Sequence, residues 1–351
     1  MHNPAEGARA KSTAAKRRMR RAMGALARSV ALAALGLTGA FVSAARPAPA
    51  KGKQPVSVLY AGSLAAVMEK SIGPAFTQKT GRAFQGEGQG STGAANMMRD
   101  GLRKPDVFIS ADAAVNEKIL MGAANSDLIR WYVTFASAEL VLGFNLKSRF
   151  APQFEEAQAG HRAWYEELAV PGAKFGRTDP DLDPKGYRTL FLFAMAQNYY
   201  KKPGIVELLG GPHNPDQIFP EPELLARLEA GQVDAAIFYR HEVLAHRLPY
   251  ISFPPQLNQG DPALAALYAQ QTYMTKKGVL MRGSPILFTV TIPVNAPDPQ
   301  GAAEFVEFLL SPEGRKLLKR AGLDNVPIRA GGDITQIPAA IRKRVEGPYQ
   351  P

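Results

Sequence analysis

The chain of 351 residues contains no cysteine. This absence excludes disulfide bonds, thiolate metal sites, cysteine catalysis and a lipid-anchored cysteine at a cleavage point. The chain therefore has to rely on its core, and 46% of its residues are hydrophobic. Its length suits one large or two medium domains.

Excess positive charge is nearly absent outside the first 50 residues. Residues 1–50 hold nine Lys and Arg against one Glu, and so carry +8 of the formal net charge of +11. The rest of the chain has 33 basic and 30 acidic side chains. A nearly neutral body lacks the basic footprint of a nucleic-acid-binding protein, so we expect no nucleic-acid partner.

Long apolar runs are also missing, apart from one short segment. A basic stretch, Lys16–Arg21, precedes the apolar run Ser29–Ala40, and small residues follow at Val42–Ala45. This order predicts a cleaved signal peptide over residues 1–45 and a flexible leader over 46–54, with the mature protein in the periplasm. An uncleaved anchor helix is the alternative, and the pattern does not separate general from twin-arginine export.

Strand-like and helix-like segments alternate after residue 54. Val56–Ala61 and Pro105–Ser110 have the composition of buried strands, with a short strand expected near residues 83–85 and a glycine-rich turn over 86–90. Helices are expected from Ser63 and from Ser91. This order predicts a parallel sheet with helices on its faces.

A second set of α/β segments lies between two long β-type runs, Thr134–Phe144 and Ile286–Pro293. We interpret these runs as crossings between two lobes. Residues 55–138 with 287–345 are expected to form lobe I, and residues 139–286 lobe II. A cleft between two lobes is a preferred ligand site, and hinges of this kind close around the ligand.

Two short motifs place a serine after a small residue where a strand leads into a helix. Gly62-Ser63 follows the first strand, and Gly90-Ser91 leads into the second helix-like segment. Hydroxyls and unpaired backbone N–H groups at helix starts bind small anions. The alternative is that both serines are ordinary N-caps.

Four segments together resemble the molybdate/tungstate-binding proteins of ABC importers, in their archaeal-type branch. The similarity extends over essentially the whole chain after the leader. The motifs that carry it are Tyr60–Leu64, Gly90-Ser91, Gly176–Arg188 and Ile237–Arg240.

The resemblance implies a two-lobed α/β fold of the type II periplasmic binding proteins, with mostly parallel sheets. It also implies that an oxyanion binds between Ser63 and Ser91 of lobe I and Asp183, Glu221 and Tyr239 of lobe II. Asp183 and Glu221 would bond to the molybdenum or tungsten atom, expanding it from four to six ligands. Hard oxygen donors suit such metals, whereas the sulfur of sulfate cannot expand in this way.

Two departures from the family pattern stand out. Lys185 occupies a position where a Cys is expected, and the stretch between Tyr200 and Glu221 is shorter. The shortening leaves Glu223 as an alternative to Glu221.

Other polar residues have simpler interpretations. The aspartates of the Asp-Pro segment could cap local backbone, and Tyr239 could be half-buried with its hydroxyl bonded elsewhere. Asp112 is interpreted as a helix cap only, and Lys174 with Arg177 as a solvated pair.

The sequence thus favours a monomeric binding protein that delivers molybdate or tungstate to an ABC permease, with no cofactor besides that ligand. A receptor for sulfate, phosphate, an organic acid or a ferric complex is the alternative. Catalysis is not expected, because Ser63 lacks a nucleophile elbow and no Ser/His/Asp arrangement is evident.

Overall fold

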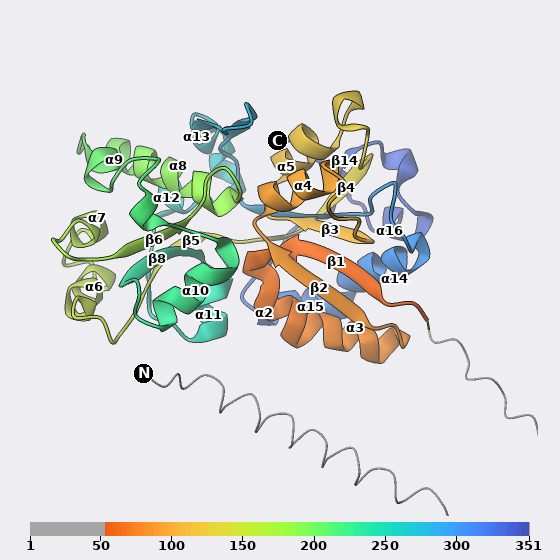
Figure 1. Ribbon diagram of the computed structural model, residues 1–351, viewed down its shortest axis with the longest axis horizontal. Coiled ribbons are helices and arrows are strands. Elements are labelled where there is room, and N and C mark those ends of the chain that lie inside the picture. Colours follow the sequence, from red (N-terminus) through yellow and green to blue (C-terminus); the bar gives the residue numbers. More distant parts are fainter. Residues whose placement is uncertain (1–52, 351) are drawn as a thin grey trace, which may run out of the picture. The chain divides into compact units, whose positions relative to one another are not determined.

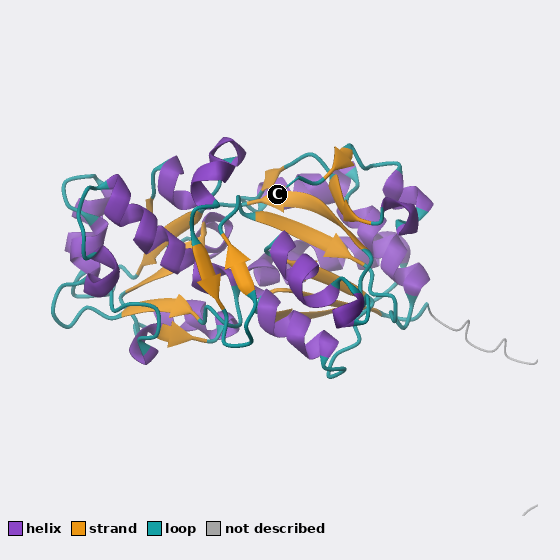
Figure 2. Cartoon of the chain, turned by 90° about the horizontal axis from the view of Figure 1, so that it is seen from above, coloured by secondary structure: helices purple, strands orange, loops and turns teal. Residues whose placement is uncertain are grey.

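The computed structural model describes residues 53–350, which form two large β-sheets covered by helices and one two-stranded sheet (Figures 1 and 2). The predicted signal peptide lies outside the described residues, as does the leader up to residue 52. Within 53–350, no helix combines the length and the apolar character needed to cross a membrane.

The first sheet has eight strands, and we call this sheet and its helices lobe I. Seven strands follow the order β15-β14-β4-β12-β3-β1-β2, and β13 pairs with β4. β1 pairs in parallel with β2 and β3, as expected, whereas β12 runs antiparallel to β3 and β4. The strands are β1 (Val56–Ala61), β2 (Phe84–Gln89), β3 (Val107–Ser110), β4 (Trp131–Ser137), β12 (Leu287–Thr291), β13 (Asp324–Asn325), β14 (Arg329–Gly332) and β15 (Gly347–Pro348).

The helices of lobe I come from both ends of the described chain. They are α2 (Ala65–Val67), α3 (Gly73–Thr80), α4 (Ser91–Arg99), α5 (Ala113–Val115), α14 (Pro299–Leu309), α15 (Pro312–Arg320) and α16 (Ala339–Arg342). The helix expected from Ser63 begins as a 3-10 turn, contains a π-helical stretch, and ends at Gly81, whose φ is 73°. Helices often end at a glycine whose backbone adopts the left-handed conformation.

The glycine-rich turn expected over residues 86–90 is wrong, because β2 continues to Gln89. Gly86 and Gly88 lie beside the Tyr60 ring, and a Cβ on them would come within 2.8 and 3.0 Å of its carbon atoms. Here glycine makes room for a neighbouring side chain instead of turning the chain.

The second sheet has five strands in the order β7-β6-β8-β5-β9, and we call it and its helices lobe II. Its strands are β5 (Leu140–Phe144), β6 (Phe175–Thr178), β7 (Ile218–Phe219), β8 (Ala235–Tyr239) and β9 (Tyr250–Ser252), with a separate hairpin of β10 (Thr272–Met274) and β11 (Leu280–Arg282). The helices are α6 (Ala151–Gln158), α7 (Trp164–Leu168), α8 (Pro184–Tyr199), α9 (Ile205–Leu208), α10 (Glu221–Glu229), α11 (Arg240–His246), α12 (Pro255–Asn258) and α13 (Ala265–Tyr268).

The chain passes between the sheets twice, within the two β-type runs singled out in the sequence. The first run divides at Ala138 and Glu139 into β4 and β5, and the second contains β12. The two-lobed α/β fold is confirmed, but both sheets are mixed, since β5 runs antiparallel to β8 and β9. The exact lobe boundaries stay predictions.

Arg177 corrects the interpretation of a solvated pair. Lys174 is exposed, but Arg177 on β6 is fully buried and donates to the backbone carbonyls of Gly211 and Pro212 at 3.1 and 2.9 Å. Burial lowers the pKa of its guanidinium to about 10. Arg177 therefore ties the loop before β7 to the sheet and does not face solvent.

An aromatic cluster joins the two chain segments that build lobe I. Phe305 on α14 is fully buried, and its ring lies 5.2 Å from that of Phe76 on α3 and 5.8 Å from that of Phe84 on β2. Such ring pairs add to the free energy gained from burial alone. Helix α14, which follows β12, is thus packed against α3 and β2 from the start of the lobe.

We expect Phe305→Ala to lower the free energy of unfolding by about 3–5 kcal/mol, because it removes a buried ring and leaves a cavity. Urea denaturation followed by circular dichroism measures this loss. Leu102→Ala is the control, since Leu102 is 66% exposed. A loss below about 1 kcal/mol in Phe305→Ala would contradict the role of the cluster.

Candidate functional site

The two lobes contact each other directly along the ends of their strands. The Gly93 N–H at the start of α4 donates to the Leu182 carbonyl at 2.8 Å. The His241 Nε2 atom on α11 lies 3.0 Å from the Ser63 carbonyl oxygen. Because burial lowers the pKa of His241 to about 3, its imidazole is neutral and donates this hydrogen bond.

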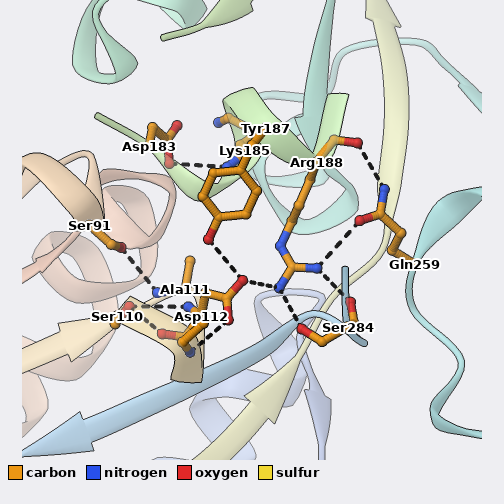
Figure 3. Close-up of polar contacts among 11 residues, drawn as sticks. Ser91, Ser110, Ala111, Asp112, Asp183, Lys185, Tyr187, Arg188, Gln259 and Ser284 are labelled. Carbon is orange, nitrogen blue, oxygen red and sulfur yellow. Dashed lines mark hydrogen bonds and ion pairs between the residues drawn. The ribbon is translucent and has the colours of Figure 1, made fainter. Parts of the chain in front are cut away.

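Ser63 and Ser91 both lie buried at this contact, and neither is an N-cap. Ser63 sits inside the 3-10 turn that follows β1. The cap position of α4 is Gly90, and the Ser91 hydroxyl instead accepts a hydrogen bond from the Ala111 N–H at 3.1 Å (Figure 3). The alternative of ordinary capping is therefore wrong for both serines.

The glycines before these serines are positions where lobe II presses against lobe I. A Cβ on Gly62 would lie 1.6 Å from Oε2 of Glu221. A Cβ on Gly90 would lie 2.6 Å from the Leu182 carbonyl oxygen and 3.0 Å from the Cβ of Asp183. Glycine at both positions leaves space for the two acidic residues as they lie in the structure, with each of them next to one serine motif.

Asp183 has two roles in the structure, one for each carboxylate oxygen. Its Oδ1 accepts from the Lys185 N–H at 3.2 Å and caps α8, as the Asp-Pro pattern indicates. Its Oδ2 is buried and has no hydrogen-bond partner among residues 53–350. Burial raises the pKa of this carboxyl above its usual range.

Glu221 begins α10, and the structure distinguishes it from Glu223. The Glu221 side chain is 4% exposed, whereas Glu223 is exposed and pairs with Arg227 at 2.8 Å. Oε2 of Glu221 has no partner within the described part of the chain. Burial, together with the nearby carboxylates of Asp183 and Glu242, raises the pKa of Glu221 to about 8 against the pull of Lys185.

Tyr239 ends β8 and is fully buried, so the interpretation as a half-buried side chain is wrong. Its hydroxyl, too, has no hydrogen-bond partner among residues 53–350. Burial raises the pKa of this phenol well above its usual value, which keeps the hydroxyl protonated. It is therefore available as a donor.

Lys185 and Glu242 lie beside Asp183 and Glu221, and we call these four side chains the cluster. Glu242 was not singled out from the sequence. The Lys185 ammonium lies 2.8 and 2.9 Å from the two oxygens of Glu242 and 3.4 Å from Oε1 of Glu221. Burial alone would lower the pKa of Lys185, but these carboxylates raise it, so the side chain stays charged. The only sequence signal for Glu242 is its place three residues after Tyr239, at the start of α11.

Asp112 caps α5 through Oδ1, as expected, but it is more than a cap. Its Oδ2 accepts from the Tyr187 hydroxyl at 2.8 Å and from the Arg188 guanidinium at 2.6 Å, both on α8 (Figure 3). Arg188 also donates to the Ser284 carbonyl at 2.6 Å. This fully buried pair therefore joins lobe I to lobe II beside the cluster.

The cluster holds more negative than positive groups. Asp183, Glu221 and Glu242 face a single ammonium, that of Lys185, and Arg188 is already paired with Asp112. Cavities of about 260 and 340 Å³ lie between the lobes, and Glu221 with Pro222 lines both. Buried carboxylates in excess of their partners have to be compensated by protons or by a bound group.

Comparison with known families matches residues 56–324 to the bacterial extracellular solute-binding proteins. The chain is 32% identical over 299 residues to an uncharacterized solute-binding protein of Petrotoga mobilis, covering 83% of this chain and 90% of that protein. It is 30% identical over 361 residues to the molybdate/tungstate-binding protein WtpA of Thermococcus kodakarensis, covering 93% of this chain and 97% of that protein.

Among solved structures, the periplasmic molybdate-binding protein of Azotobacter vinelandii is similar with a TM-score of 0.53. The two share 16% sequence identity, and the match covers 76% of this chain and 98% of that one. At this identity the similarity concerns the fold alone.

We expect the ligand-free protein to lose stability between pH 4.5 and pH 8, because the folded state holds a proton on Glu221 that the unfolded state has released. Glu221→Gln removes this contribution, so the variant should gain stability relative to the wild type as the pH rises through this window. Urea unfolding at several pH values measures the difference.

Glu223→Gln is the matched control, because its carboxylate lies on the surface two residues away and should give a curve parallel to the wild type. Parallel curves for Glu221→Gln as well would contradict the burial of an ionisable Glu221.

Proposed function

Because the chain belongs to the bacterial extracellular solute-binding proteins, we propose that it captures molybdate or tungstate between its lobes and delivers it to the permease of an ABC transporter. The ligand-binding residues in this proposal are Ser63, Ser91, Asp183, Glu221 and Tyr239.

The observation that carries the proposal is that two buried carboxylate oxygens lack a hydrogen-bond partner. Oδ2 of Asp183 and Oε2 of Glu221 are buried between the lobes and unmatched within residues 53–350. Both donate electron pairs once a ligand has displaced the proton that Glu221 holds in the ligand-free protein. A ligand that offers only acceptor oxygens, such as sulfate, cannot satisfy the ionised carboxylates and would add like charge at short range. The site instead suits a ligand whose central atom accepts electron pairs.

Molybdate and tungstate combine both requirements. Their central atom can accept two further oxygen donors, and Asp183 and Glu221 would supply them. Their oxo groups need hydrogen-bond donors, and the Tyr239 hydroxyl and the two serine motifs would provide these. Lobe I would then compensate the charge of the oxyanion with hydrogen-bond donors. The carboxylates of lobe II would bind only an oxyanion whose central atom can accept them as ligands.

The name of the Thermococcus kodakarensis relative supports this ligand class. We further propose an export signal over residues 1–45, a periplasmic location of the mature chain, a monomeric state and a binding role without catalysis. An ABC permease is the partner that this role requires.

Isothermal titration of the purified protein is expected to give tight, one-to-one binding of molybdate and tungstate and no measurable heat with sulfate or phosphate. The reason is that only the first two can accept the carboxylate oxygens. Tight binding of sulfate would refute the six-coordinate site. Absence of heat with all four anions, in protein freed of bound ligand by unfolding and refolding, would refute an oxyanion receptor, and ferric citrate is then the next ligand to titrate.

Asp183→Asn should lower the affinity for molybdate by about 100-fold or more, because the amide still caps α8 but donates electrons poorly to a metal centre. The control is Asp261→Asn, a half-buried cap in lobe II that accepts from the Ala263 N–H at 2.9 Å. A receptor for ordinary tetrahedral anions would instead bind as well or better without the negative charge of Asp183.

A further inference from the structure

Two charged groups of the cluster, Lys185 and Glu242, have no part in the proposed ligand set. Lys185 is 1% exposed, and its ammonium lies within hydrogen-bond reach of Glu242 and Glu221. A buried lysine costs free energy unless it is paired, and here it is paired twice. We propose that Lys185, anchored by Glu242, is a positioning residue that directs one oxygen of Glu221 toward the ligand. This inference rests on the proposed function.

The anchor is fixed by backbone as well as by charge. Oε2 of Glu242 accepts from the Tyr239 N–H at 2.7 Å, so the carboxylate is tied to the end of β8. Both of its oxygens also receive the Lys185 ammonium. The ammonium lies 5.4 and 5.5 Å from the ring centroids of Phe238 and Tyr239, which limit where it can move.

The ammonium in turn fixes the orientation of Glu221. Its contact at 3.4 Å is with Oε1 alone, and Oε2 is the oxygen that would meet a Cβ on Gly62. One oxygen of Glu221 is thus occupied inside lobe II, and the other lies at the start of the 3-10 turn that contains Ser63. Three helices contribute to this chain of contacts, Lys185 from α8, Glu221 from α10 and Glu242 from α11.

The chain of contacts also keeps two like charges together. Without the ammonium, Oε1 of Glu221 would face the Glu242 carboxylate with no positive group between them, and the Glu221 side chain would rotate away. This rotation removes an electron-pair donor from the ligand site. Lys185 therefore contributes to ligand selection although it bonds to Glu221 instead of to the ligand in this proposal.

The test compares Lys185→Met with the double variant Lys185→Met/Glu242→Gln, using molybdate as the probe in isothermal titration and in molybdenum K-edge X-ray absorption. We expect Lys185→Met to bind molybdate at least 10-fold more weakly, with a lower coordination number at molybdenum than in the wild type. The double variant should stay weak, because removing the surplus charge of Glu242 does not restore the orientation of Glu221.

Lys79→Met is the matched control, since Lys79 lies on lobe I in an exposed pair with Glu313. Glu242→Gln alone keeps the lysine and tests the anchor if Lys185→Met does not fold, with an affinity expected below that of the wild type. Wild-type affinity and coordination number in the single lysine variant, or in Glu242→Gln, would overturn the inference. Recovery in the double variant would also overturn it, because Lys185 would then be only a counter-charge.

These results are distinct from a failure of the proposed function. If the wild type itself does not bind molybdate or tungstate, the proposed function fails. If the wild type binds and the lysine variant binds equally well, only the positioning role fails.

Discussion

The burial of lobe II carboxylates against the helix starts of lobe I is the constraint on which the rest of the site depends. Gly62 and Gly90 bear no side chain, so Glu221 and the backbone before Asp183 reach the backbone of the opposite lobe. This contact excludes water from the carboxylates but does not give each of their oxygens a hydrogen-bond partner within the described residues. The fold tolerates the cost because Lys185 and Glu242 form a paired charge next to them. The strands that end at this contact, β1, β3 and β8, therefore have to keep their register.

Polar contacts between the lobes surround the cluster on two sides. On one side Asp112 binds Tyr187 and Arg188, and on the other the neutral His241 imidazole donates to the Ser63 carbonyl. The His241 contact reaches Ser63, a member of the predicted ligand set, and the Asp112 contact reaches α8, the helix that Asp183 caps. A movement that separates the lobes would break these bonds and open the cluster to water at the same time. Closure and site assembly are thus the same structural event.

Local sequence patterns predicted those features that local chemistry determines. The strand β1, the Asp183 cap of α8 and the two crossings all follow from short patterns of apolar residues and aspartate. Ser63 and Ser91 were indicated by the serine motifs at two helix starts, whereas Asp183, Glu221 and Tyr239 came from the family resemblance alone. The structure places all five in the buried region where the lobes meet. Whether they bind the ligand stays a prediction.

Features determined by partners far away in the sequence were missed. Gly86 and Gly88 were predicted to form a turn, because the Tyr60 ring that occupies the space beside them lies on another strand. Arg177 was predicted to be solvated, because the carbonyl groups that accept its hydrogen bonds come from a loop over 30 residues away. The pairing of Lys185 with Glu242 spans 57 residues, so no spacing rule indicates it. Asp112 shows the same limit, since its cap is local and its contact with Arg188 is not.

The shared location of ligand residues and lobe contacts has a thermodynamic consequence. A ligand shifts the equilibrium between open and closed lobes only by the difference in its affinity for the two states. Asp183 and Glu221 come from lobe II and the serines from lobe I, so a ligand that needs both sets is held fully only when the lobes are closed. An anion satisfied by the serines alone gains little from closure and meets the unmatched carboxylates as an added cost. Selection between anions would then arise from closure itself, because the free energy of closing depends on whether the central atom accepts the carboxylate oxygens.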